Sequence, residues 1–125
     1  MKTWIALRGL LDSAEKDAGY DELDPISQRM LEWIAVRKQD DAPLYIQEVV
    51  MKSGIASPAT VHKSIALLER LGYLRITVDS ADTRRRAIAL TTQAERVLRT
   101  LSQQIDRWAK SMAGAESARA QNRKE

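Results

Sequence analysis

Arg84, Arg85 and Arg86 form the longest run of like charge in the sequence. Adjacent cations repel one another, whereas guanidinium groups bind phosphate well and enter a narrow DNA minor groove, where the potential is most negative. Asp82 lies two residues before Arg84, so its carboxylate can hold that guanidinium in position. The run therefore favours a polyanionic partner, although a solvated charged turn would have the same composition.

A second group of polar residues lies on one face of a helix predicted over residues 58–71. Ser57 and Pro58 form a helix-start signal, because a serine oxygen accepts free backbone N–H groups and proline suits the first helical position. The face opposite the apolar positions is slim and slightly basic, which fits a helix that enters a DNA major groove. A core helix with a polar side is the alternative. The outward residues are Ala59, Thr60, His62, Lys63 and Ala66.

The residue types of the sequence give little support for a catalytic site or a metal site. The chain has no cysteine, which excludes disulfides, thiolate metal sites and cysteine nucleophiles, and fits a cytoplasmic location. Its one histidine, His62, has no companion at ligand spacing, and no glycine-rich phosphate loop is present. We therefore expect no enzyme activity, no metal and no cofactor. No apolar run is long enough for a membrane span, so a membrane partner is not expected.

Charge is divided unevenly along the 125 residues, which are enough for one domain. Residues 1–50 carry six Lys/Arg against ten acidic residues, whereas residues 51–125 carry fourteen against seven. A basic half on a small domain is typical of nucleic-acid binding, although many small proteins have basic surfaces.

Hydrophobic spacing predicts the elements that position these residues. Steps of three and four predict helices over 3–18, 24–38, 47–52 and 58–71, and a last helix from Thr91 or Thr92 to about residue 113. Alternation predicts a hairpin of strands 73–78 and 85–90, and residues 44–46 form a possible short strand. Thr92 and Glu95 match a capping box. The predicted inward positions are Ile26, Met30, Trp33, Ile34, Leu74, Ile76, Val78, Ile88 and Leu90, with Val49, Val50 and Met51 partly inward, Leu31 left open and Tyr73 outward.

This element order predicts a mainly α fold with a small β-hairpin wing, a winged helix-turn-helix with terminal dimerisation helices. The expected parts are an N-terminal dimerisation helix and loop (1–23), the winged helix-turn-helix (24–92), a C-terminal dimerisation helix (93–113) and a flexible tail (114–125). The apolar stripe on the last helix lacks a partner within so small a core, so it predicts self-association. The dimerisation residues expected on this stripe are Val97, Leu101, Ile105, Trp108 and Met112.

Residues 57–74 and 79–91 resemble the winged helix-turn-helix of the MarR family of bacterial transcriptional regulators. The resemblance lies in a Ser/Thr-rich start of the second helix, in Leu68-Glu69 followed by Gly72, and in an acidic-Arg wing that closes in Leu90-Thr91. It covers about residues 24–100. The resemblance implies that Thr60 and Lys63 face DNA, that Arg84 is the wing-tip arginine and that Asp82 is its acidic partner. It also implies that the N-terminal helix joins the C-terminal helix in a dimer interface, which adds Trp4, Leu7 and Leu11 to the expected dimerisation residues.

We therefore expect a homodimeric, sequence-specific regulator of transcription that binds double-stranded DNA at a pseudo-palindromic operator, most simply as a repressor. Helix 58–71 would lie in the major groove and wing 79–86 on the adjacent minor groove. A protein–protein interaction module with weak or no DNA binding is the alternative. Trp4, Tyr20, Met30 and Trp33 either line a crevice for a small aromatic effector or belong to the core. The expected DNA-binding residues are Ser57, Ala59, Thr60, His62, Lys63, Arg84, Arg85 and Arg86.

Overall fold

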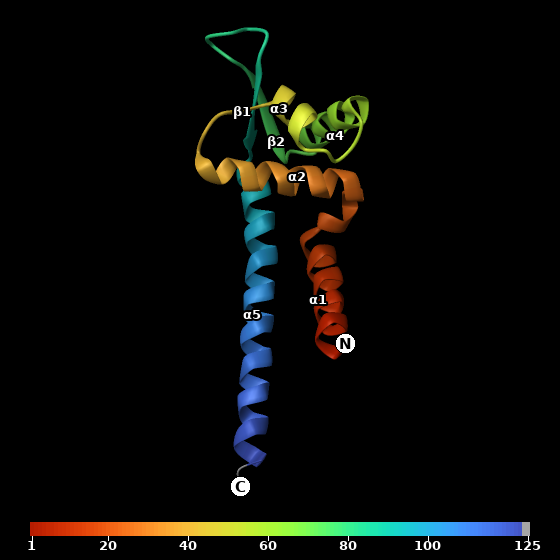
Figure 1. The fold of residues 1–125 in the computed structure, drawn as a ribbon, viewed down its shortest axis with the longest axis vertical. Helices are drawn as coiled ribbons and strands as arrows, with labels where there is room; N and C mark the ends of the chain where they lie inside the picture. Colours follow the sequence, from red (N-terminus) through yellow and green to blue (C-terminus); the bar gives the residue numbers. More distant parts are fainter. Residues whose placement is uncertain (124–125) are drawn as a thin grey trace. The chain divides into compact units, whose positions relative to one another are not determined.

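The computed structural model describes residues 1–123, and Figure 1 shows their helices and strands, with most of them labelled. The chain divides into two compact units. One comprises residues 23–96, and the other comprises residues 1–22 together with the chain from Val97 onward. Among the described residues, no helix has both the length and the apolar character that a membrane span requires.

The unit of residues 23–96 is mainly helical with a small antiparallel sheet, which confirms the predicted fold class. The strands lie in the order β1-β3-β2, so that β3 is central, and Ile88 pairs with Leu44 on one side and with Ile76 on the other. Its elements are α2 (Pro25–Arg37), a 3-10 turn (Lys38–Asp40), β1 (Leu44–Tyr45), α3 (Ile46–Lys52), α4 (Pro58–Arg70), β2 (Leu74–Val78), β3 (Arg86–Leu90) and the start of α5 (Thr92–Arg123).

The core of this unit lies between α2, α4 and the sheet. It consists mainly of aliphatic side chains, whose spacing follows the helical and strand periodicities of the sequence. The buried hydrophobic residues of this unit are Leu23, Met30, Leu31, Ile34, Leu44, Val49, Val61, Ile65, Leu68, Tyr73, Leu74, Ile88 and Ala94. Because one face of α4 is committed to this core, its opposite face is left for solvent.

Both predicted polar-cap-and-proline signals begin a helix. The Asp24 carboxylate accepts the Ser27 backbone N–H at 3.1 Å and the Ser27 hydroxyl at 2.6 Å, and Pro25 takes the first helical position of α2. The Ser57 hydroxyl accepts the Thr60 N–H at 3.4 Å at the start of α4. These bonds satisfy donors that the first turn of a helix leaves free.

A left-handed glycine ends α4 and turns the chain into β2. Gly72 has φ 86°, a conformation that costs little without a Cβ. The N–H groups of Tyr73 and Gly72 donate to the carbonyls of Leu68 and Glu69, respectively, at 2.9 and 3.0 Å. This pair of bonds is the Schellman motif, which satisfies the last carbonyls of the helix.

The cap of α5 differs from the predicted capping box. The Thr91 hydroxyl, not that of Thr92, accepts the N–H of Ala94 at 3.1 Å. The third position of the helix is therefore Ala94 rather than Glu95, and the reciprocal carboxylate bond is missing. The Thr91 hydroxyl also donates to the Gly72 carbonyl, and this second bond selects Thr91 as the cap.

Four predicted side-chain orientations are wrong. Ile26 is 36% exposed because it lies in the first turn of α2, and Met51 is 72% exposed because it lies about 200° around α3 from the buried Val49. Val78 is 53% exposed at the end of β2, where the hairpin leaves the core. Tyr73 is buried because it follows the turn at Gly72 and lies before β2 begins, so the alternation of the strand does not yet apply.

The terminal unit contains α1 (Lys2–Ala18), which ends at the left-handed Gly19, a 3-10 turn (Tyr20–Glu22) and most of α5. The sequence predicts that the last helix ends near Ala113, but α5 continues to Arg123. The predicted helix end is therefore wrong. The helix continues because the residues beyond Ala113 include several alanines, which have the strongest helix propensity. Of the predicted tail 114–125, the last two residues lie outside the described part of the chain.

Replacing Asp24 by alanine should lower the free energy of unfolding by about 1 kcal/mol near neutral pH, because the cap of α2 is lost. The hydrogen bond from the Ser27 side chain, together with backbone N–H groups, holds the pKa of Asp24 below its ordinary value. The contribution of the carboxylate is therefore present above the pKa of an unfolded aspartate and is lost as the pH falls through the lower pKa of the folded state.

Urea unfolding of both proteins near pH 7 and near pH 2 measures this difference. Asp24→Asn is the control, since its amide oxygen can still cap the helix without titrating. A difference between Asp24→Ala and wild type that does not shrink at the lower pH would contradict the assignment.

Candidate nucleic-acid interface

The outward face of α4 is slim and carries a cation. Ala59, His62 and Lys63 are exposed, and Thr60 is half-buried in the first turn, while Val61 and Ile65 point into the core. Ser57, which caps the helix, is also exposed. The small side chains leave room for a close approach to this face, and the free N–H groups of the helix start carry a partial positive charge.

The β2–β3 hairpin carries a loop, residues 79–85, that main-chain bonds close. The Asp79 N–H donates to the Arg85 carbonyl and the Arg85 N–H donates to the Asp82 carbonyl, both at 3.0 Å. The Asp79 carboxylate accepts the Asp82 N–H at 3.2 Å. We call strands β2 and β3 and this loop the wing. Its loop has a defined backbone although it projects from the core.

The predicted contact between Asp82 and Arg84 is present. One carboxylate oxygen of Asp82 accepts the Arg84 backbone N–H at 3.0 Å and its Nε–H at 3.2 Å. The backbone N–H of Arg84, then its side chain and then the charge of Arg85 hold the pKa of Asp82 below its ordinary value. The Arg84 side chain is 91% exposed, so the carboxylate orients the guanidinium without covering it.

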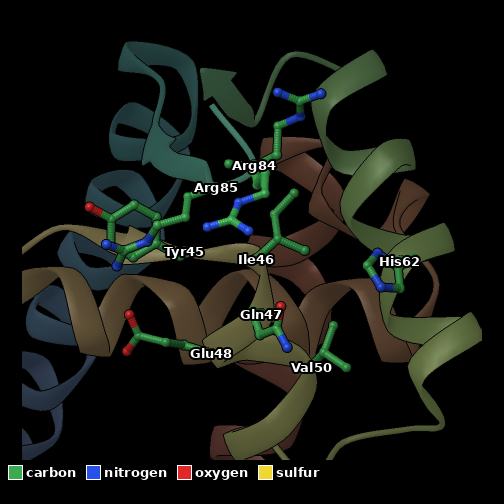
Figure 2. A pocket seen from close by; sticks show the side chains of 9 residues that line it. Tyr45, Ile46, Gln47, Glu48, Val50, His62, Arg84 and Arg85 are labelled. Atoms are coloured by element: carbon green, nitrogen blue, oxygen red, sulfur yellow. The ribbon is translucent and has the colours of Figure 1, made fainter. Parts of the chain in front are cut away.

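A groove of about 710 Å³ lies between the wing and the helix-turn-helix (Figure 2). His62 forms part of the α4 side, residues of β1 and α3 form the floor, and the arginines of the wing form the other side. The structure thus brings His62 together with the wing arginines. Ser57, Ala59, Thr60 and Lys63 are not part of this lining. The lining residues are Tyr45, Ile46, Gln47, Glu48, Val50, His62, Arg84, Arg85 and Arg86.

Arg85 has a partner that the sequence does not reveal. Its guanidinium carbon lies 3.6 Å from the centroid of the Tyr45 ring, a close cation–π contact that Figure 2 shows at one end of the groove. The sequence marks residues 44–46 as a possible strand but does not show which strand they pair with. Tyr45 is therefore a site residue that the sequence analysis missed.

The predicted dimerisation residues are only partly covered within one chain. Trp4 is 63% exposed, and Ile105 and Met112 are 37% and 39% exposed. The others, Leu7, Leu11, Val97, Leu101 and Trp108, are half-buried. Both terminal helices thus present apolar surface that the chain itself leaves accessible.

The candidate effector residues do not share one environment. Tyr20 and Met30 are buried, Trp33 is half-buried, and Trp4 is exposed. An arginine lies over each of these two tryptophans: the guanidinium carbon of Arg37 is 5.4 Å from the centroid of the Trp33 ring, and that of Arg8 is 5.8 Å from the centroid of the Trp4 ring. Within residues 1–123, no group of three or more His, Asp or Glu side chains is placed to hold a metal ion.

Solved structures with the same arrangement identify the fold. The MepR–DNA complex of S. aureus superposes with a TM-score of 0.75 at 20% sequence identity, covering 98% of this chain and 86% of MepR. The chain has the winged helix-turn-helix fold of the MarR type. A MepR variant bound to an oligodeoxyribonucleotide gives a TM-score of 0.71 at 20% identity, covering 98% of this chain and 91% of that one.

A third MarR-type structure comes from another organism. The transcriptional regulator Tm0710 of Thermotoga maritima gives a TM-score of 0.67 at 18% identity, covering 96% of this chain and 84% of the regulator. No protein-family profile and no curated protein sequence matches the chain. The MarR-type fold is thus shared over nearly the whole chain while most of the residues differ.

Removing the carboxylate of Asp82 should loosen the tip of the wing without unfolding the protein. In Asp82→Ala, the Arg84 N–H loses its acceptor, and its order parameter in NMR relaxation should fall from about 0.85 to below about 0.6. The melting temperature should not change, because the pair is exposed. Asp82→Asn keeps an oxygen acceptor and should stay close to wild type. An equally rigid Arg84 amide in Asp82→Ala would show that this contact does not order the tip.

Proposed function

We propose that the protein is a homodimeric regulator of transcription that acts in the cytoplasm and binds double-stranded DNA sequence-specifically. In this proposal α4 lies in the major groove, the wing lies on the adjacent minor groove, and occupancy of the operator represses transcription. One observation carries the proposal: the arginines of the wing and His62 of α4 border the same groove, next to the exposed, slim face of α4.

The chemistry of α4 suits base reading. Thr60 and His62 can donate to or accept from base edges, and Ala59 leaves space for the helix to enter the groove. Lys63 supplies an ammonium group one turn from the helix start, where the backbone N–H groups and Ser57 can bind a phosphate. Phosphate contacts of this kind fix the register of the helix, and the side chains of the first turns then distinguish the bases.

Arg84 is suited to the minor groove. Its guanidinium is exposed and oriented by Asp82, so little conformational freedom remains to be lost on binding. Arg86 is exposed at the start of β3 and adds positive charge beside it. The structures of MepR with DNA support the proposal, since they show that this fold in another protein binds DNA.

The terminal helices are the proposed dimer interface. Their accessible apolar residues support this role. The net charges of the two segments are also opposite in sign: residues 1–22 carry three Lys/Arg against five acidic residues, and residues 97–125 carry six against three. A two-fold dimer presents two α4 helices to one side of the duplex. The half-sites should then lie roughly 34 Å apart, one helical turn, in a pseudo-palindrome.

Arg84→Ala should weaken binding to all duplexes and should reduce the slope of log affinity against log salt concentration by about 0.9, the value for one phosphate contact. Lys63→Ala should have a similar effect. Arg75→Ala is the matched control, because Arg75 is an exposed arginine of the same sheet at the end of β2 remote from the wing loop. Fluorescence anisotropy with duplex DNA at several salt concentrations measures these slopes.

An affinity of the wild-type protein that does not depend on salt would contradict phosphate contact. Loss of binding to the same extent in Arg75→Ala would contradict the assignment to the wing. Failure of the wild-type protein to retain any duplex at micromolar concentration would favour the protein–protein interaction module instead.

Ile105→Asp should shift the protein from dimer to monomer, because a carboxylate would be buried without a partner in the proposed interface. Gln103→Asp adds the same charge to an exposed position about 200° around α5 and should remain dimeric. Sedimentation equilibrium gives the mass of each. Equal masses for the two variants would contradict the proposed dimer surface, and circular dichroism checks that both are folded.

A further inference from the structure

We propose that Tyr45 and Arg85 form a clamp that positions the wing, and that Arg85 supports the DNA contact through this clamp rather than as a phosphate ligand. The inference rests on the proposed function for its effect on DNA binding. Its effect on the wing itself does not depend on DNA. The proposal changes the role that the sequence indicates for Arg85 and adds Tyr45 to the site.

The sheet register brings the two side chains together. Tyr45 pairs with Ala87 across the antiparallel strands β1 and β3. Side chains two residues apart on a strand share a face, so Arg85 is the diagonal neighbour of Tyr45 on that face. At 3.6 Å from the ring centroid, the guanidinium covers the face of the aromatic ring. Figure 2 shows the two side chains in contact at the end of the groove away from His62.

Each residue of the clamp lies at a junction. Tyr45 ends β1 and occupies the N-cap position of α3, which begins at Ile46 and is the first helix of the helix-turn-helix. Arg85 is the last residue of the wing loop, and its N–H and carbonyl make the two main-chain bonds that close that loop. The stacked pair therefore links the start of the helix-turn-helix to the base of the loop.

The backbone pairing of β1 with β3 is short, so by itself it connects the start of α3 to the wing over only two residues. The strand has two residues, which pair with Ile88 and Ala87 of β3, so this ladder ends at Ala87, two residues from Arg85 at the end of the wing loop. The side-chain contact of Arg85 extends the connection by two residues beyond Ala87, the last position of β3 that pairs with β1. Arg84 immediately precedes Arg85, and it is thus oriented on one side by the clamp and on the other by the carboxylate of Asp82.

Adjacent arginines then have different tasks. Arg84 extends into solvent with its guanidinium accessible, whereas one face of the Arg85 guanidinium is stacked on a ring. If the Arg85 side chain moved to bind a phosphate elsewhere, its guanidinium would lose the stacking contact with the Tyr45 ring. The clamp therefore predicts that an uncharged residue, Tyr45, affects DNA affinity about as strongly as Arg85 does.

The experiment compares Tyr45→Leu, Arg85→Met and the double variant, with Tyr45→Phe as the control that keeps an aromatic ring. Duplex affinity should fall about two- to fivefold in each single variant, the equivalent of one exposed cation–π contact, and should not fall further in the double variant. Tyr45→Phe should bind as wild type. The salt slope should stay unchanged in Tyr45→Leu, in contrast to the decrease of about 0.9 expected for Arg84→Ala.

Hydrogen exchange of the DNA-free protein tests the clamp independently. The amides of Asp79 and Arg85, which close the wing loop, should exchange about two- to fivefold faster in both Tyr45→Leu and Arg85→Met. If the wild-type protein does not bind duplex DNA, the proposed function fails, and these exchange rates still decide whether the clamp exists.

Two results would overturn the proposal. One is wild-type affinity in Tyr45→Leu together with a reduced affinity and salt slope in Arg85→Met, which would make Arg85 a phosphate ligand. The other is unchanged exchange of both amides in the two single variants. If Tyr45→Leu fails to fold, the exchange rates of the same two amides in Arg85→Met alone test the clamp. This variant should fold, because the Arg85 side chain is exposed and its replacement leaves the backbone hydrogen bonds intact.

Discussion

The left-handed turn at Gly72 fixes the geometry on which the candidate interface depends. Its positive φ ends α4 and directs the chain into β2, and its carbonyl accepts the hydroxyl of Thr91. The Thr91 N–H donates to the carbonyl of Tyr73, and the same hydroxyl caps α5. The end of α4, both ends of the hairpin and the start of α5 are therefore joined by a few hydrogen bonds, so α4 and the wing keep a fixed relation.

The candidate interface follows from two further constraints on that frame. The core takes Val61, Ile65 and Leu68 of α4, and this leaves the small and polar face of the helix outside. The hairpin extends beyond the core, so the cations at its tip have no interior in which to be paired. Charged groups are costly to bury and well solvated at the surface, where they can attract a polyanion. The distribution of apolar residues thus determines the position of the cations.

Local signals in the sequence predict most of the elements correctly. Asp24 and Ser57 with the prolines that follow them mark two helix starts, and Gly72 marks a helix end, because capping and left-handed conformations depend on neighbouring residues alone. The pair of Asp82 and Arg84 is predictable for the same reason, as its partners are two residues apart. The exposure of the outward face of α4 is also predictable, because the apolar residues recur at helical spacing and lie on the opposite face.

Features that depend on distant residues could not be predicted in this way. The choice of Thr91 over Thr92 as the cap of α5 requires the carbonyl of Gly72, 19 residues away. The contact of Tyr45 with Arg85 requires the pairing of β1 with β3, since a two-residue strand has too little pattern to reveal its partner. The exposure of Val78 depends on where the hairpin leaves the core, which strand alternation does not encode.

Mapping of amide chemical shifts during a titration with duplex DNA tests the central claim most directly. If α4 and the wing form one DNA-binding surface, the large shifts at low salt should fall together on residues 57–63 and 82–86 and should diminish as salt is added. Shifts on only one of these two segments, or a main cluster on α1 or the far end of α5, would contradict it.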